Sequence, residues 1–377
     1  MEIPKEIKIQ PRHFFPNLNG LRFIGAFMVF VFHAFSLGRE IWGDFSKSGW
    51  FKGIYTITNK GHIGVSMFFV LSGFLITYLM LSEVRTNGKI RLSNFIARRI
   101  LRVWPLYFLI VIFGFFIFPL LPYGIETVHA FWRYALFLSN IDEVINGMYD
   151  SINFLTATWS VSVEEQFYLS WAALIALLGF RKQRTFLFFF LCIILVTIIF
   201  RASNTGNERI VYYHTLSVIS DLAIGGLAAL LAFKGNIQVF FEQLSRWKII
   251  CIYILGALMI LLESKIFPGY LFTFQRICFG IFFAFIILEQ VYAPKSFFKA
   301  DSIPGLKRSG EFTYGFYMFH CIFIYYWQQL FIQLGWTQHF YFFGIYLVLT
   351  FACTYTASWL SFLYFEKPFL RMKRFFR

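Results

Sequence analysis

The first long apolar run of the chain, Leu21 to Leu37, carries an arginine and a histidine eleven residues apart, Arg22 and His33. Eleven residues are close to three helical turns, so both side chains lie on one face of a helix, roughly 16 Å apart along its axis. Ionisable groups inside a membrane span are costly and usually mark an interior path or site. His33 suits a general base near neutral pH, and Arg22 suits contact with an anionic ligand. The alternatives are a histidine that only packs between helices and an arginine that reaches the membrane interface.

A second set of candidates is the adjacent carboxylate pair Glu164 and Glu165, inside the segment TWSVSVEEQFY at residues 158–168. We expect the pair about 12 Å deep in a span, close to the level of His33. Neighbouring residues point about 100° apart around a helix, so only one of the two can meet the histidine. We predict that Glu164 pairs with His33 and that Glu165 acts on stability or acceptor binding. The alternative is a buried structural ion pair.

A third set is the arginine pair Arg99 and Arg102, which lies at the start of the third predicted span. Residues three apart share one face of a helix, and two guanidinium groups there suit a phosphate-rich ligand. The alternative is anchoring of the span by contacts with lipid headgroups. Asp221 and His320 are further ionisable residues inside predicted spans, and their pattern leaves open whether they are structural or functional.

The composition determines what kind of elements must position these residues. Of the 377 residues, 58% are hydrophobic and 14% are charged, whereas an average soluble domain is about a quarter charged. Apolar runs of span length recur throughout, which predicts an all-α, polytopic membrane helix bundle. The formal charge of +15 could suggest nucleic acid, but the lysines and arginines lie between the apolar runs, as is typical of membrane topology. Nucleic-acid binding is therefore not expected.

The cysteines point to no metal site. They lie in or beside apolar runs, and no two of them have the spacing of metal ligands. We expect small buried hydrophobic side chains at all five positions. They are Cys192, Cys251, Cys278, Cys321 and Cys353.

Ten helical spans are predicted, in one integral-membrane domain that covers residues 1–377 with no appended soluble domain. An even number of spans places both termini on one side of the membrane. That side carries 25 of the 34 lysines and arginines, and the other side carries nine, which predicts that both termini are cytoplasmic. The predicted ranges are 20–38, 62–81, 100–119, 156–179, 185–200, 215–233, 248–263, 273–292, 313–334 and 340–364.

The longest predicted loop covers about residues 120–155, on the outer side. Within it, the segment His129 to Leu138 is amphipathic and aromatic. This segment could lie along the outer interface or dip back into the protein.

Together these residues resemble the acyltransferase family 3 membrane proteins, which O-acylate bacterial polysaccharides and lipopolysaccharide. The resemblance runs nearly from end to end of the chain. One position differs, because many members have an arginine two residues before the aspartate that is Asp221 here, whereas this chain has Ile219. The resemblance therefore carries over no arginine partner for Asp221. The similar segments are Asn19-Gly20-Leu21-Arg22 with His33, GVSMFFVLSGF at 64–74, Arg99-Ile100-Leu101-Arg102, WSVSVEEQFY at 159–168, Tyr314-Gly315-Phe316-Tyr317 with His320, and Phe365-Glu366-Lys367-Pro368-Phe369.

The resemblance implies an enzyme of the cytoplasmic (inner) membrane that moves an acyl group, expected to be acetyl, from cytoplasmic acyl-CoA to a hydroxyl of a cell-envelope sugar or glycolipid. His33 would be the base or a brief acyl carrier, and one of the two glutamates would hold its tautomer. Arg22, Arg99 and Arg102 would bind the phosphates of acyl-CoA. Some members carry a soluble esterase-like domain, which is not expected here, so an extracytoplasmic partner protein would supply any later transfer.

Two other classes of protein fit parts of the sequence. A transporter or flippase of a glycolipid or an anionic solute also needs many spans and buried charges, but the sequence has no clear inverted repeat. A non-catalytic sensor or scaffold does not account for the buried ionisable residues. Hydrolysis of acyl-CoA that depends on His33 would separate an acyltransferase from a transporter.

Overall fold

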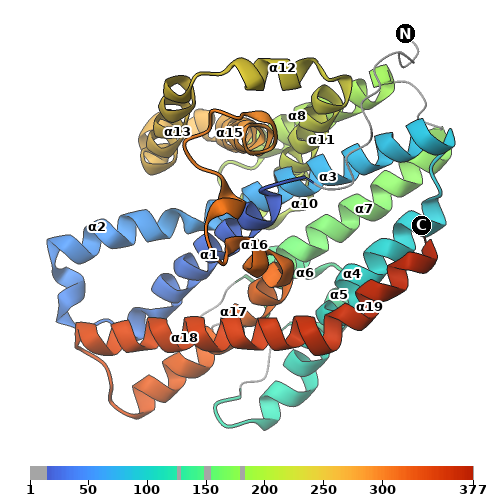
Figure 1. Cartoon of the computed structure of the whole chain (residues 1–377). Helices are drawn as coiled ribbons and strands as arrows, with labels where there is room; N and C mark the ends of the chain where they lie inside the picture. Colours follow the sequence, from blue (N-terminus) through green and yellow to red (C-terminus); the bar gives the residue numbers. More distant parts are fainter. Residues whose placement is uncertain (1–14, 125–128, 148–153, 179–182, 377) are drawn as a thin grey trace. The chain divides into compact units, whose positions relative to one another are not determined.

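The structure of the protein is a computed structural model (Figure 1), which describes residues 15–124, 129–147, 154–178 and 183–376. Throughout this part of the chain the regular secondary structure is helical, and no strand occurs in it. The chain forms two compact units. Unit 1 comprises residues 1–22, 66–96 and 164–307, and unit 2 comprises residues 23–65, 97–163 and 308–377.

Unit 1 contains the larger parts of α3 and α7 and a continuous series of helices after them. The unit boundaries fall inside α1, α3, α4, α7 and α16, so residues of one helix can belong to different units. The helices that lie wholly or mainly in unit 1 are α3 (Gly64–Asn87), α7 (Thr158–Leu178), α8 (Gln183–Ser203), α9 (Glu208–Tyr213), α10 (Thr215–Val218), α11 (Ser220–Lys234), α12 (Asn236–Gln243), α13 (Arg246–Leu261), α14 (Glu263–Ile266) and α15 (Phe272–Tyr292).

Unit 2 is organised around two long C-terminal helices, α17 and α18, which lie side by side (Figure 1). The helix α17 ends in a Schellman motif, in which the N–H groups of Gly335 and Trp336 donate to the carbonyls of Ile332 and Phe331. The φ of Gly335 is 68°, a value that glycine adopts without strain. The helices wholly or mainly in unit 2 are α1 (Leu18–Leu37), α2 (Gly49–Thr58), α4 (Leu92–Ile112), α5 (Phe131–Ala135), α6 (Ser139–Asn146), α17 (Thr313–Gln333), α18 (Phe340–Ser361) and α19 (Lys367–Met372). The short helix α16 (Leu306–Ser309) is divided equally between the two units.

The helical membrane bundle is confirmed, but the count of ten spans is not. Each of the ten predicted ranges overlaps a helix in the described part of the chain. Six helical segments there are long and apolar enough to cross a membrane, or seven if the bent pair Ser220–Lys234 and Ile237–Gln243 is one span. The helices α11 and α13 have 15 and 16 residues, fewer than the roughly 20 of a typical span. The helices α7 and α17 are long enough but carry many polar side chains.

Glycines bring α3 and α11 of unit 1 into close contact. A Cβ atom on Gly73 would lie 2.0 Å from the carbonyl oxygen of Leu222, and one on Gly225 would lie 2.0 Å from that of Val70. Neither position can take a larger residue without moving a helix. Such small-residue contacts are typical of packing between membrane helices.

Also in unit 1, the start of α1 is capped by an aspartate from a distant part of the chain. The carboxylate of Asp301 accepts hydrogen bonds from the backbone N–H groups of Asn17 and Gly20, at 2.9 and 2.8 Å. The side chain of Asn17 in turn donates to the carbonyl of Gln290 at 2.8 Å. An acidic side chain at a helix N-terminus satisfies free N–H groups and complements the helix dipole, so these bonds fix where α1 begins.

The segment after α4 folds back onto that helix inside unit 2. The Tyr107 hydroxyl of α4 donates to the carbonyl of Tyr134 at 2.9 Å, and the Tyr107 and Phe137 rings stack at 4.4 Å. The Asp142 carboxylate is fully buried and binds His129 and Arg133. The segment therefore packs one face against α4, while Phe131, Trp132 and Leu136 stay exposed. Both placements of His129 to Leu138 stay predictions.

Candidate active site

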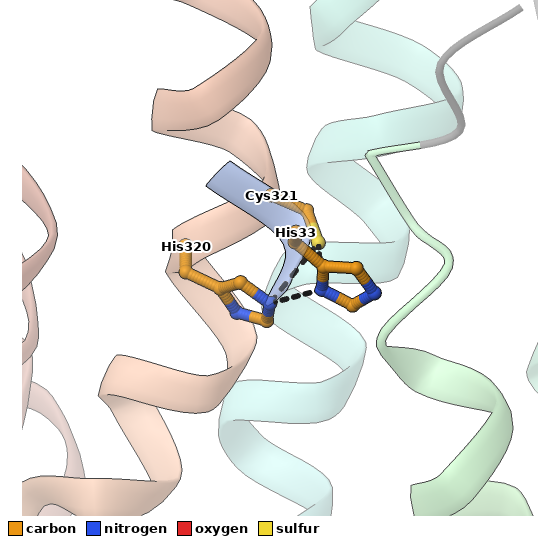
Figure 2. Close-up of side chains that lie close together, drawn as sticks. All are labelled: His33, His320 and Cys321. Atoms are coloured by element: carbon orange, nitrogen blue, oxygen red, sulfur yellow. Dashed lines mark hydrogen bonds between the residues drawn. The ribbon is translucent and has the colours of Figure 1, made fainter. Parts of the chain in front are cut away.

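The centre of unit 2 contains a pair of histidines from α1 and α17. Nδ1 of His33 lies 2.8 Å from Nε2 of His320, within hydrogen-bond distance (Figure 2). The ring planes differ by only 13° while the centroids are 5.0 Å apart, so the rings meet edge to edge rather than face to face. One helical turn before the histidines, Phe30 and Phe316 pack at 5.5 Å. This aromatic contact sets the rotation of α1 against α17 and aims the two imidazoles at each other.

The hydrogen bonds of His320 determine which nitrogens carry protons. Its Nδ1 lies 2.6 Å from the carbonyl oxygen of Tyr317. A carbonyl only accepts, so Nδ1 of a neutral His320 carries the hydrogen and its Nε2 is an acceptor. Nδ1 of His33 must then donate, which leaves Nε2 of His33 with a free lone pair. This chain of hydrogen bonds therefore sets up His33 as a base at Nε2.

A cysteine completes the cluster around the two imidazoles. Sγ of Cys321 lies 3.3 Å from Nε2 of His320 and 3.6 Å from Nδ1 of His33, and Figure 2 shows all three side chains converging. Cys321 is fully buried, His320 is 1% exposed, and His33 is only partly buried. A ligand can therefore reach the cluster at His33. Cysteine spacing predicted a plain hydrophobic residue at Cys321, and the pattern around His320 left its role open.

The predicted anion contact Arg22 lies in the first part of α1. Its Nη1 donates to the side-chain oxygen of Asn19 at 2.9 Å, and the residue is half-buried. Arg22 and His33 share α1 as predicted, but Arg22 belongs to unit 1 and His33 to unit 2. Contact of Arg22 with a donor phosphate stays a prediction.

The two predicted glutamates lie on α7, in unit 1. Glu164 accepts hydrogen bonds from the hydroxyls of Ser72 and Tyr168, at 2.8 and 2.9 Å. Glu165, its neighbour, is 2% exposed. His33 itself makes its hydrogen bond to His320, within unit 2. Pairing of His33 with Glu164 therefore stays a prediction.

The predicted phosphate ligands Arg99 and Arg102 lie on α4, in unit 2. Arg99 is half-buried and Arg102 is exposed, so both can meet a ligand from outside the bundle. Arg102 interacts electrostatically with Glu366, which is 7% exposed. The Glu366 carboxylate also packs closely against Gly315, because a Cβ atom added to Gly315 would lie only 3.1 Å from Oε1 of Glu366. Three of the recognised sequence motifs, which contain these residues, therefore meet in one region of unit 2.

Asp221 has an arginine partner after all, although Ile219 stands where many family members have one. Its carboxylate lies 2.8 Å from Nη2 of Arg276, which comes from α15 of the same unit. Arg201 also interacts with Asp221 electrostatically. The arginine is thus supplied by another helix, which corrects the inference drawn from the local motif.

Comparison with known proteins identifies the family. The chain matches the family model Acyl_transf_3, described as an acyltransferase domain, over residues 15–359. It is a multi-pass membrane protein of the acyltransferase 3 family.

Two curated O-acetyltransferases are similar to most of the chain. It is 28% identical over 334 residues to the peptidoglycan O-acetyltransferase OatA of Listeria monocytogenes, covering 82% of this chain and 49% of the relative. It is also 28% identical over 341 residues to the O-acetyltransferase OatA of Staphylococcus aureus, covering 83% and 51%. The chain thus spans about half the length of these curated relatives. No solved structure matches it.

Proposed function

We propose that this protein is a membrane O-acetyltransferase that moves an acetyl group from acetyl-CoA to a hydroxyl of a cell-envelope glycan, with His33 as the base. The observation that carries the proposal is the hydrogen-bond chain from Tyr317 through His320 to His33. Family membership and the names of the relatives support O-acetyl transfer. Peptidoglycan, which one of those names specifies, is the first acceptor to test.

The reaction needs a base because a sugar hydroxyl is a weak nucleophile at neutral pH. Nε2 of His33 takes the hydroxyl proton while the oxygen attacks the thioester carbonyl. The C–S bond then breaks, and the protonated imidazole returns its proton to the departing thiolate. During this cycle Nδ1–H of His33 keeps donating to His320, so the ring holds one orientation. The donor and acceptor exchange one acetyl group for one proton, and the enzyme ends unchanged.

The same nitrogen can instead carry the acetyl group. Nε2 attacks the thioester and the thiolate leaves, so an acetyl-imidazolium that keeps its Nδ1–H forms at His33. The sugar hydroxyl then takes the acetyl group, its proton passes to the thiolate, and neutral His33 is restored. This route suits a donor and an acceptor that reach the histidine at different times. Both routes use the lone pair that the hydrogen-bond chain leaves free.

The arginine positions support acetyl-CoA as the donor. Coenzyme A carries several phosphate groups, and Arg99 and Arg102 offer two guanidinium groups on one face of α4. Arg102 is exposed and Arg99 half-buried, so a phosphate can approach both without unfolding a helix.

The test uses the purified protein in lipid nanodiscs with acetyl-CoA and soluble peptidoglycan fragments. We expect release of free coenzyme A and acetylation of the fragments, seen by mass spectrometry. His33→Ala should lower turnover by about 10² to 10⁴, and the exposed His339 provides the control variant His339→Ala. Turnover at the wild-type rate by His33→Ala would exclude His33 as the base and as the acetyl carrier. Movement of a glycolipid across the bilayer without thioester cleavage would instead indicate the transporter or flippase.

A further inference from the structure

We propose that His33, His320 and Cys321 form a binding site for a soft divalent transition metal such as Zn²⁺, and that a metal bound there switches the enzyme off. The site shares His33 with the proposed catalytic machinery but uses its other ring nitrogen, Nδ1, and adds Cys321. Its inhibitory effect rests on the proposed function of His33 as base, whereas metal binding itself does not. All three residues belong to unit 2.

The three ligand atoms are spaced as a metal requires. Nδ1 of His33, Nε2 of His320 and Sγ of Cys321 all lie within 4.8 Å of one another, with separations of 2.8, 3.3 and 3.6 Å. Zinc bonds of about 2.0 Å to nitrogen and 2.3 Å to sulfur in a tetrahedron place such atoms roughly 3.3 to 3.6 Å apart. The two nitrogens have to move apart by about 0.5 Å, and Sγ and Nε2 of His320 by about 0.2 Å.

The ligand set selects the kind of metal. Two imidazole nitrogens and a thiolate suit Zn²⁺ and other soft or borderline ions, whereas Mg²⁺ and Ca²⁺ need oxygen ligands. Three protein ligands leave a fourth position for water or another ligand. The partial exposure of His33 leaves a side from which an ion can enter.

The atoms behind the ligands also fit a metal site. A metal-bound histidine usually donates its other N–H to a carbonyl or carboxylate, which fixes its orientation. His320 does this through Nδ1 to the carbonyl of Tyr317, at 2.6 Å. The backbone of Ala157 makes a hydrogen bond to the side chain of Cys321, so the sulfur is also held in place. Both partners are built into unit 2 without any ion.

Metal binding and base catalysis compete for the same proton. In the catalytic state Nδ1 of His33 carries a hydrogen and Nε2 carries the lone pair. A metal takes the lone pair of Nδ1, so the hydrogen has to move to Nε2, and the thiol of Cys321 loses its proton to solvent. Each metal ion therefore releases one proton and removes the lone pair that accepts the sugar hydroxyl proton. The two states exclude each other.

The test measures metal binding and activity on the same nanodisc preparations. Co²⁺ should give a thiolate-to-cobalt charge-transfer band in wild-type protein, and calorimetry with Zn²⁺ should show one site per chain. Cys321→Ala should lose the band, weaken Zn²⁺ binding by at least about 100-fold, and keep its acetyltransferase activity. Cys353→Ala, which changes a cysteine on α18, is the matched control and should retain the band.

Zn²⁺ should lower wild-type and Cys353→Ala activity at least tenfold, reversibly with a chelator, and leave Cys321→Ala active. Three results would overturn the proposal: no cobalt–thiolate band in wild type, equal Zn²⁺ sensitivity of Cys321→Ala, or loss of activity when the metal is chelated. Cys321→Ser, checked by size-exclusion chromatography, guards against a packing defect at position 321. Failure of the proposed function would look different, because His33→Ala would then retain full turnover in metal-free buffer.

Discussion

Ser72 of α3 donates a hydrogen bond to Glu164 of α7, with 2.8 Å between the two oxygens. The bond joins two sequence motifs that lie 92 residues apart. Tyr168, one turn further along α7, donates to the other oxygen of the same carboxylate at 2.9 Å. Through these two hydrogen bonds Glu164 connects α3 to α7 within unit 1, which gives it a structural role.

Our first prediction concerns the two neighbouring glutamates. In Glu164→Gln, an amide N–H₂ faces one of the two hydroxyl donors, so one bond to a charged acceptor is lost, at a cost of about 1.5–3 kcal/mol. We expect a lower unfolding temperature in detergent and a lower catalytic rate. Glu165→Gln should act mainly on stability or on acceptor binding. Identical rate losses and identical changes in unfolding temperature for the two variants would contradict the assignment of different roles.

A second prediction treats His320 as the positioning residue of His33. His320→Ala removes the acceptor of the His33 Nδ1–H bond, so the ring loses its preferred tautomer and orientation. We expect kcat to fall by about 10² with little change in the KM for acetyl-CoA. His320→Gln keeps a carbonyl oxygen that can accept this bond, and it should recover part of the rate. A purely structural role would show equal loss in both variants and a fall in protein stability that accounts for it.

The third prediction separates donor binding from chemistry. Arg99→Gln and Arg102→Gln should each raise the KM for acetyl-CoA, because a charge-assisted bond to phosphate contributes about 1.5–3 kcal/mol. Lysine at either position should recover only part of the affinity, since it lacks the planar fork of arginine. Steady-state kinetics with each substrate in turn make the measurement. An unchanged KM combined with failed membrane insertion would show that these arginines serve topology alone.

The helices were predictable from sequence because the signal for a membrane helix is local. Apolar runs of span length directly indicated helices, and each of the ten predicted ranges overlaps a helix in the described part of the chain. The number of spans was harder to predict, because α7 and α17 combine helical length with polar side chains. Their polar residues belong to the same motifs that suggested chemistry.

The contacts of the candidate site were not predictable, because they depend on which helices pack together and how each is rotated. His33 and His320 are 287 positions apart, and neither local sequence indicates which other residue its histidine contacts. The same holds for Asp221 and Arg276, where the local motif suggested no arginine. The spacing between cysteines could not indicate a cluster at Cys321, because the atoms next to its sulfur are nitrogens of His33 and His320. His33 lies on another helix, far away in the sequence.

A fourth prediction concerns acid stability of the folded-back segment after α4. Burial raises the pKa of Asp142, but hydrogen bonds from His129 and Arg133 and the charge of His129 outweigh this effect, and the net pKa lies below the usual 3.8. A carboxyl group with a lowered folded-state pKa stabilises the protein above its unfolded pKa, and that contribution is lost as pH falls through the folded value. Wild-type unfolding temperature should therefore fall below about pH 4.

The control for this prediction is Asp142→Asn, which removes the titrating group. It should be less stable than wild type at neutral pH, and the difference between the two proteins should shrink as the pH falls below about 4. A constant difference across that range would mean that Asp142 does not titrate with folding. Thermal unfolding in detergent, followed by intrinsic tryptophan fluorescence, supplies the measurement.

The last prediction concerns the buried ion pair of Asp221 and Arg276. Asp221 is fully buried, and the side chain of Arg276 is only 12% exposed. Removing one partner leaves an uncompensated buried charge, so Asp221→Ala and Arg276→Met should each destabilise unit 1 by about 3–5 kcal/mol. The double variant leaves no unpaired charge at these two positions and should be more stable than either single variant. Arg201 also interacts with Asp221. In Asp221→Ala, Arg201 therefore loses a favourable interaction too, which should lower the stability of this variant further. A double variant that loses the sum of the two single effects would show that the two residues act independently.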